Sequence, residues 1–462
     1  MVIDLKYWHQ HLVRRHVPIY PLVWFRIIFG TIMLFSTARF MALGWIEEHY
    51  IEPVFHFHYY GFHWIAPLDL MGMYLVHILL LVAALFVVLG WYYRWSALLV
   101  FLCFTYTELI DLTYYLNHYY FVSLLSFLML LLPAHRACSL DVRWRKLSYC
   151  NRVPIWTINS LKLMIAIVYV YAGLAKINTT WLLDAMPLKL WLSAHDKMPL
   201  IGDFLAYPPT AYLFSWAGML YDTCIIFFLL YRPTRKWAFA SVVAFHTLTA
   251  LLFQIGVFPL VMIVVVTIFF SDEWHKEKLL QLAHFFDRKQ VHYLNTKAIK
   301  PYQNSTLQGR LIPLFLAAFF LFQLFFPWRY LLYDSNIFWS EEGYRYSWRV
   351  MLMEKSGTAT FYVKDGVTGK EGRVVNSDFL NRHQEKQMAM QPDMIIQYVQ
   401  FLGRYYRKKG IQNPSIRAEV FVTLNGYPSQ LFIDPQLDLL TIKDDWSKRD
   451  WIKDLLQVAS RG

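Results

Sequence analysis

Long runs of apolar residues dominate the first 328 positions of the chain. A helix that spans a bilayer needs about 20 largely apolar residues. The segments that come near this length are 20–40, 69–92, 95–113, 119–135, 154–176, 208–231, 235–253, 255–271 and 310–328. The fourth and the eighth are short, and the 235–271 stretch can be divided differently. The pattern therefore predicts a polytopic α-helical membrane protein with about nine transmembrane helices.

The hydrophobic pattern changes after about Trp328. "TATFYVKDGVTGKEGRVV" and "AEVFVTLNGYPSQLFID" alternate apolar and polar residues around turns, which is typical of β-strands and hairpins. The stretch 392–409 between them has the spacing of an amphipathic helix. We therefore predict three regions: a cytosolic amphipathic segment at 1–19, a transmembrane domain at 20–328 and an extracytoplasmic α+β domain at 329–462.

The charges are few, and their placement indicates topology. Only 16% of the residues are charged and the mean hydropathy is +0.33, whereas soluble domains carry about 25% charged residues. The net charge is +12, but the loop at 134–153 is basic and the loop at 41–68 is acidic. This alternation follows the positive-inside rule, with a cytosolic N-terminus. The basic charge therefore marks membrane topology, and we expect no nucleic-acid partner.

Several polar residues converge on the outward side of the predicted spans. Asn117 and His118 lie in a turn between spans, Lys176 ends the fifth span, and Asp222 and His246 lie within later spans. Lys176 alone is typical of an anchor that holds its charge at the lipid headgroups, or else of a buried catalytic base. Asp222 and His246 alone are typical of hydrogen bonds between helices. The residues leave open a transporter, a lipid-binding module and an enzyme.

A histidine-rich loop follows the first predicted span. Its sequence, "EPVFHFHYYGFHW", places aromatic residues between the histidines, and aromatic rings are typical of membrane interfaces. No clean spacing of carboxylates and histidines accompanies it. We therefore predict that the protein has no metal site.

Stretches spread in order along the chain resemble the vitamin K-dependent γ-glutamyl carboxylase family, which has an HTTM-type membrane domain. They are "EEHYIEPVFHFHYYGFHWIAPL", "NHYY", "YVYAGLAKINTTW", "AFHTLTALLFQIGVFP", "WSEEGYRYSWRVMLMEKSG", "VKDGVTGKEG" and "FIDPQLD". The last cysteine is Cys224, so the disulfide that ties the membrane and lumenal regions of the animal enzymes together cannot form. The resemblance is therefore to a bacterial homologue, in the inner membrane, or to a protein of the endoplasmic reticulum if the source is eukaryotic.

The resemblance implies a peptidyl-glutamate 4-carboxylase-like enzyme, a carbon–carbon lyase with vitamin K epoxidase activity. Its cofactors are vitamin K hydroquinone (a reduced menaquinone-type naphthoquinone), O2 and CO2, with no metal. Oxygenation of the quinol to its epoxide drives deprotonation of a glutamate γ carbon, which then takes up CO2. The partners implied are a glutamate-containing protein or peptide on the extracytoplasmic side and the lipid membrane.

The resemblance also implies roles for individual residues. Lys176 matches the lysine that deprotonates the hydroquinone, and His118, with Asn117 beside it, matches the histidine that handles the carbanion and CO2. The residues implied to bind the quinone are Tyr169, Tyr344 and His246. Two alternatives stay open: a quinol epoxidase that does not carboxylate glutamate, and a non-catalytic module that binds a quinone or a lipid.

Overall fold

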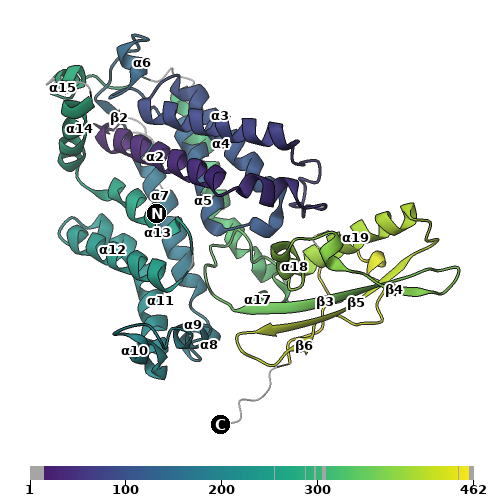
Figure 1. Ribbon diagram of the computed structural model, residues 1–462. Helices are drawn as coiled ribbons and strands as arrows, with labels where there is room; N and C mark the ends of the chain where they lie inside the picture. The colour runs from purple at the N-terminus through teal and green to yellow at the C-terminus, as the bar shows by residue number, and fades with distance from the viewer. Residues whose placement is uncertain are drawn as a thin grey trace, which may run out of the picture.

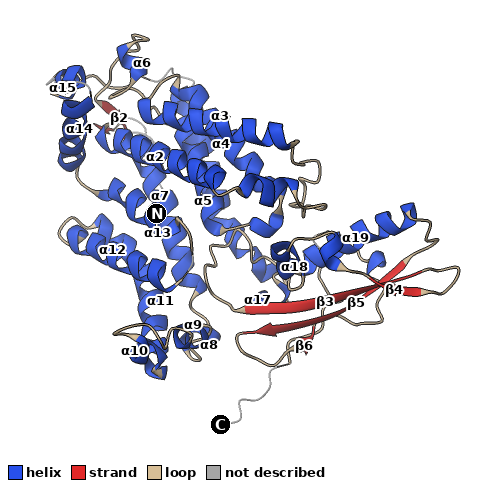
Figure 2. Cartoon of the chain, in the orientation of Figure 1, coloured by secondary structure: helices blue, strands red, loops and turns tan. Residues whose placement is uncertain are grey.

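The structure is a computed structural model that describes residues 15–253, 255–286, 288–295, 298–303, 308–445 and 447–456. Most of the predicted N-terminal segment 1–19 lies outside these residues. Helices make up the first two thirds of the chain, and a region of strands and helices follows them (Figures 1 and 2).

The long helices pack into a bundle around α7. They are α2 (Tyr20–Ala42), α3 (Leu70–Leu89), α4 (Tyr93–Ile110), α5 (Asn117–Leu131), α7 (Ile155–Ala175), α11 (Pro208–Leu230), α12 (Arg235–Leu252) and α16 (Gln308–Phe325). In sequence order, α2 to α5 pack side by side, and α7 contacts α2, α5, α11 and α16 (Figure 1). Helix α7 therefore lies between helices that come before it in the sequence, α2 and α5, and helices that come after it, α11 and α16.

Short elements connect these helices. They are β1 (His16–Pro18), α6 (Leu140–Arg143), β2 (Arg152–Pro154), α8 (Thr179–Leu182), α9 (Leu188–Ser193), α10 (Gly202–Ala206), α13 (Phe258–Val265), α14 (Asp272–Phe286), α15 (Arg288–Leu294) and α17 (Ile337–Ser340). Strands β1 and β2 pair antiparallel. They join the start of α2 to the start of α7, so both helices enter the bundle from one end.

The number of spans differs from the prediction. Among the described helices, five are long and apolar enough to cross a membrane: α2, α3, α7, α11 and the segment Leu311–Leu332. A sixth follows only if Phe258–Phe269 and Asp272–Phe285 count as one span. The chain bends by 116° between these two helices. The other predicted spans form α4, α5 and α12, which are shorter or more polar. Five or six spans are therefore supported, and nine are not confirmed.

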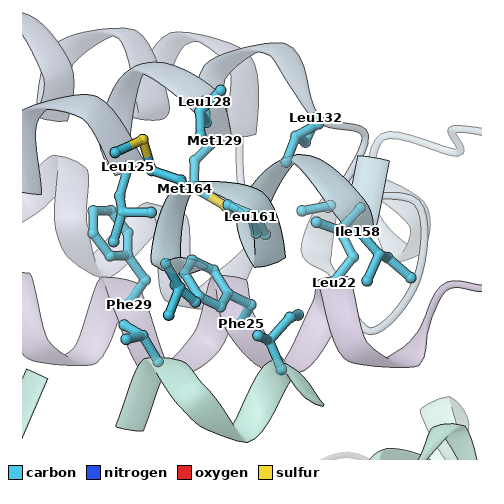
Figure 3. Packing of buried hydrophobic residues seen from close by; sticks show 14 of the residues in the cluster. Leu22, Phe25, Phe29, Leu125, Leu128, Met129, Leu132, Ile158, Leu161 and Met164 are labelled. Carbon is cyan, nitrogen blue, oxygen red and sulfur yellow. The ribbon is translucent and has the colours of Figure 1, made fainter. Parts of the chain in front are cut away.

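The centre of the bundle is a close-packed apolar cluster between α2, α5 and α7 (Figure 3). In a bilayer the surrounding lipid is as apolar as the side chains, so helices associate through close packing and hydrogen bonds. The residues labelled in Figure 3 are Leu22, Phe25 and Phe29 of α2, Leu125, Leu128, Met129 and Leu132 at α5, and Ile158, Leu161 and Met164 of α7.

The C-terminal region is a four-stranded antiparallel sheet with two helices. The strands are β3 (Lys355–Lys364), β4 (Glu371–Arg373), β5 (Ser415–Leu424) and β6 (Gln430–Leu431), in the order β4-β3-β5-β6. Helices α18 (Arg382–Met388) and α19 (Pro392–Lys408) come between β4 and β5. Both predicted hairpins and the predicted helix are present. Asn425 and Gly426 have φ of 49° and 78°, the positive values that a tight hairpin turn requires.

Amide side chains join the sheet region to the helical bundle. Gln384 Nε2 donates to Asp111 Oδ2 and to the Phe55 carbonyl, both at 2.7 Å. Gln397 pairs with the backbone of His58, since Oε1 accepts from the amide at 2.8 Å and Nε2 donates to the carbonyl at 2.9 Å. These buried hydrogen bonds hold the C-terminal domain at one end of the bundle, because a polar group that lost its partner there would cost free energy.

An ion pair ties the first turn of α19 to the loop before β3. Asp393 accepts from Arg345, its Oδ1 accepts from the Met394 amide at 2.9 Å, and Arg449 lies 3.8 Å away. Burial raises the pKa of the Asp393 carboxyl, but the two guanidinium groups outweigh it and hold the pKa below its usual range. A carboxyl group with a depressed pKa stabilises the fold above its unfolded pKa, and this stabilisation is lost as the pH falls.

We predict that Asp393→Asn lowers the free energy of unfolding by about 3 kcal/mol, because it leaves buried guanidinium groups without their counter-charge. The matched control is Asp334→Asn, whose ion pair with Lys448 is exposed, and we expect its stability to be unchanged. Thermal unfolding in detergent measures both. The wild type should also lose stability as the pH falls below about 4, and Asp393→Asn should lack this part of the acid dependence.

Candidate functional site

The stretch that ends α7 places two polar residues by helix capping. Lys176 is the C-cap of α7, and its Nζ donates to the Ala172 carbonyl at 3.2 Å. The carbonyl end of a helix carries partial negative charge, which favours a cation there. Asn178 is the N-cap of α8, because its side chain accepts from the Trp181 amide at 2.9 Å. The chain therefore turns directly after Lys176 and brings Trp181 back beside it.

Lys176 forms a buried ion pair. Its Nζ lies 2.7 Å from Oδ2 of Asp222 on α11, and 5.5 Å from the ring centroid of Trp181. The side chains of Lys176 and Asp222 are only 8% and 9% exposed. An anchor at the lipid headgroups would keep its ammonium in water, so this geometry does not fit the anchor interpretation.

Close contact between α7 and α11 makes this pair possible. Gly173 lies where a Cβ atom would come 2.3 Å from Thr223 Oγ1 and 2.6 Å from the Thr223 amide nitrogen. Glycine therefore allows the two helix backbones to approach at this level, as small residues do in membrane bundles. Lys176 is three residues further along α7, and Asp222 is the neighbour of Thr223. The close approach thus lies beside the ion pair.

A second hydrogen bond links α7 to α12. Tyr169 Oη lies 2.9 Å from His246 Nε2. Tyr169 is two helical turns before Lys176, and both side chains line a cavity of about 120 Å³ together with Asp222 and His246. The aromatic side chains that line the same cavity are Trp181, Trp191, Phe214, Phe245, Phe253 and Phe258. The site therefore combines one buried charge pair with mostly aromatic walls.

The predicted pair Asn117 and His118 lies close to this cavity but does not line it. His118 stacks on Phe258 with ring centroids 5.2 Å apart, and Phe258 in turn lies 6.2 Å from His246. Asn117 Nδ2 donates to the Arg349 carbonyl at 2.8 Å. The structure thus places His118 one aromatic ring away from the cavity, with Asn117 holding the C-terminal domain beside it.

Tyr344 lies apart from the other predicted residues. Its ring is 6.3 Å from that of Phe338, and it does not line the cavity, whereas Val350 and Met351 of the same segment do. Sequence reasoning did not pick out Phe258 or Trp181, although Trp181 ends the stretch that contains Lys176. The only available signal was an aromatic residue near a polar one, which is common throughout this chain.

Two protein families match the chain. Residues 14–274, more than half of its length, match the HTTM domain. Residues 308–458 match the lumenal domain of vitamin K-dependent gamma-carboxylase. The chain belongs to the vitamin K-dependent γ-glutamyl carboxylase family. No solved structure matches it.

Membership in the γ-glutamyl carboxylase family settles the coarse class of the protein. It is a membrane protein of the carboxylase-like enzyme class, with a C-terminal domain that corresponds to the family's lumenal, extracytoplasmic domain. Among the described residues, no group of three or more His, Cys, Asp or Glu side chains could hold a metal ion. The division at residue 329 and the roles of individual residues remain predictions.

The residues around Lys176 suit an apolar ring ligand that carries a hydroxyl group. Flat aromatic walls suit an apolar ring system, and the Lys176–Asp222 pair offers a group that can exchange a proton with a phenolic hydroxyl. A whole drug-sized ligand takes a pocket of about 300–1,000 Å³. The cavity of about 120 Å³ is therefore sized for the reacting part of a substrate.

We predict that Gly173→Ala lowers the free energy of unfolding by about 1–3 kcal/mol, because overpacking would push α11 away from α7. The same shift should separate Lys176 from Asp222 and reduce activity. The matched control is Gly218→Ala on α11, where a new Cβ meets only Trp181 at 4.0 Å. Thermal unfolding of both variants and turnover of Gly173→Ala test this. Equal stability of the two variants would contradict the assigned role of Gly173.

Proposed function

We propose that the protein couples oxygenation of vitamin K hydroquinone to its epoxide with carboxylation of a glutamate γ carbon, and that the cavity around Lys176 is the site of the proton transfer. The observation that carries this proposal is the buried Lys176–Asp222 pair within aromatic walls. The reduced quinone, when bound, supplies with O2 the strong base that no side chain can provide. The proposed substrates are glutamate-containing proteins or peptides on the extracytoplasmic side.

Lys176 and Asp222 would act as one unit in this site. Nζ of Lys176 and Oδ2 of Asp222 lie 2.7 Å apart, a hydrogen-bond distance across which a proton can pass. In the ion-paired state Lys176 is an ammonium that cannot accept a proton, whereas the Asp222 carboxylate can. A proton from a bound hydroxyl group is therefore taken up by the Asp222 carboxylate, or by the Lys176 amine once its own proton has moved to Asp222 across the 2.7 Å contact.

The aromatic walls would keep bulk water away from that proton. Tyr169 and His246 hydrogen-bond to each other, so neither needs water inside the cavity. A site without water strengthens the electrostatic interactions of the pair and protects reactive species from quenching. His118 is separated from the cavity by the ring of Phe258, a position from which it could serve the glutamate and CO2 side of the reaction.

One experiment separates the proposed reaction from its alternatives. Purified protein in nanodiscs receives vitamin K hydroquinone, O2, labelled bicarbonate and a glutamate-containing peptide, and epoxide and fixed label are measured separately. We expect both products. Epoxide without fixed label would leave a quinol epoxidase and remove the carboxylase part of the proposal. If neither product exceeds background, the protein is a non-catalytic binding module.

We predict that Lys176→Met lowers epoxide formation about 100-fold or more, the usual contribution of a positioned proton-transfer group. The matched control is Lys162→Met on the same helix, since Lys162 lies 14 residues before Lys176 and near the ring of Phe269. Lys162 does not line the cavity around Lys176. Lys162→Met should keep wild-type turnover. Unchanged epoxide formation in Lys176→Met would remove Lys176 from the proton-transfer step.

A further inference from the structure

A second and larger cavity lies between the helical bundle and the C-terminal domain. Its volume is about 660 Å³, and its lining comes from α4, α5, α16 and the loops around α19. Among the described residues, none lines both this cavity and the one around Lys176. A ligand whose reacting part occupies the cavity around Lys176 therefore does not account for this larger cavity.

One half of the larger cavity is apolar and reaches deep into the bundle. Phe101 lies nine residues before the outer end of α4, and Phe127 lies ten residues after the start of α5. At 1.5 Å per residue, these rings are about 13–15 Å below the helix ends. The hydrocarbon core of a bilayer is about 30 Å thick. Phe319 and Phe322 line the same half and lie near the middle of the apolar span Leu311–Leu332, so this half reaches about the middle of the membrane.

The other half is charged and predominantly acidic. Three guanidinium groups and six carboxylates line it: Arg329, Arg345, Arg449, Glu108, Glu341, Glu342, Asp393, Asp444 and Asp445. Arg345 and Arg449 both face Asp393, and Glu341 pairs with Lys355. The carboxylates outnumber the guanidinium groups, so a bound cation would reduce the net negative charge of this half.

Five charged groups in this lining form no ion pair with a described residue. Glu342, Asp444 and Asp445 accept hydrogen bonds instead, which leaves Glu108 and Arg329. Glu108, two residues before the end of α4, makes no hydrogen bond or ion pair with any described residue, and Thr105 Oγ1 one turn earlier is buried without a partner. Arg329 donates only to backbone carbonyls, those of Phe326 and Arg345. A carboxylate without a partner at the edge of the hydrocarbon region costs free energy. A guanidinium group without a counter-charge is a preferred site for phosphate.

We propose that this cavity binds one phospholipid with an ammonium headgroup, of the phosphatidylethanolamine class. An acyl chain fills the apolar half, the ammonium neutralises Glu108, and Arg329 contacts the phosphate. A peptide does not suit the apolar half, because its backbone would have unsatisfied polar groups at that depth. An isoprenoid quinol would suit the apolar half but would leave Glu108 without a cation. This inference does not rest on the proposed function.

The test uses the full-length protein, purified in mild detergent and reconstituted in nanodiscs that contain equal amounts of phosphatidylethanolamine and phosphatidylglycerol. Native mass spectrometry and lipid extraction then identify what stays bound. We expect one phosphatidylethanolamine per chain. Leu124→Trp, which fills the cavity from α5, should reduce the amount of bound phosphatidylethanolamine at least tenfold. The matched control is Leu102→Trp, because Leu102 is 50% exposed on α4 and does not line the cavity.

Glu108→Gln provides a second variant with little change in shape, in case Leu124→Trp does not fold. Removing one charge-assisted contact should reduce the preference for phosphatidylethanolamine over phosphatidylglycerol about tenfold. Equal retention of the two lipids by the wild type, co-purification of a quinone in place of phospholipid, or unchanged lipid in both Leu124→Trp and Glu108→Gln would each overturn the proposal.

Discussion

The buried ion pair between Lys176 and Asp222 is the constraint on which the rest of the site depends. Neither charge is stable alone at membrane depth, so each requires the other within hydrogen-bonding distance. That requirement brings the end of α7 against the middle of α11, and Gly173 removes the Cβ atom that would keep the helices apart. Tyr169 and His246 then meet across the same cavity because α12 packs beside α11.

The segment that links the bundle to the sheet contributes to both cavities. Gly343, Arg345 and Tyr346 line the larger cavity, whereas Val350 and Met351 line the one around Lys176. Asn117 holds this segment through the Arg349 carbonyl. The C-terminal domain is therefore part of the walls of both sites, and any shift in its docking would change the shape of both. This arrangement gives a physical reason for the family's pairing of a membrane domain with a lumenal domain.

Sequence reasoning succeeded where the physical signal was local. The alternation around Asn425-Gly426 and the amphipathic spacing predicted at 392–409 both correspond to elements of the structure, because hairpin turns and helix faces depend on residues close together in the chain. The nine spans predicted from hydropathy are not confirmed, because hydropathy registers apolar content and not the continuity of a helix. The stretch 255–271 breaks at Phe269, and the chain then turns by 116°.

By itself, the sequence determined the membrane class, the α+β character of the C-terminal region, the family, and the set of polar residues that could carry chemistry. Apolar content, periodicity and motif order are properties of the chain, so they need no coordinates. Only the tertiary structure decided which residues meet: that Asp222 pairs with Lys176 across 46 positions, that His118 reaches the cavity only through Phe258, and that Tyr344 lies elsewhere. Such contacts depend on how helices distant in sequence pack, which no local pattern encodes.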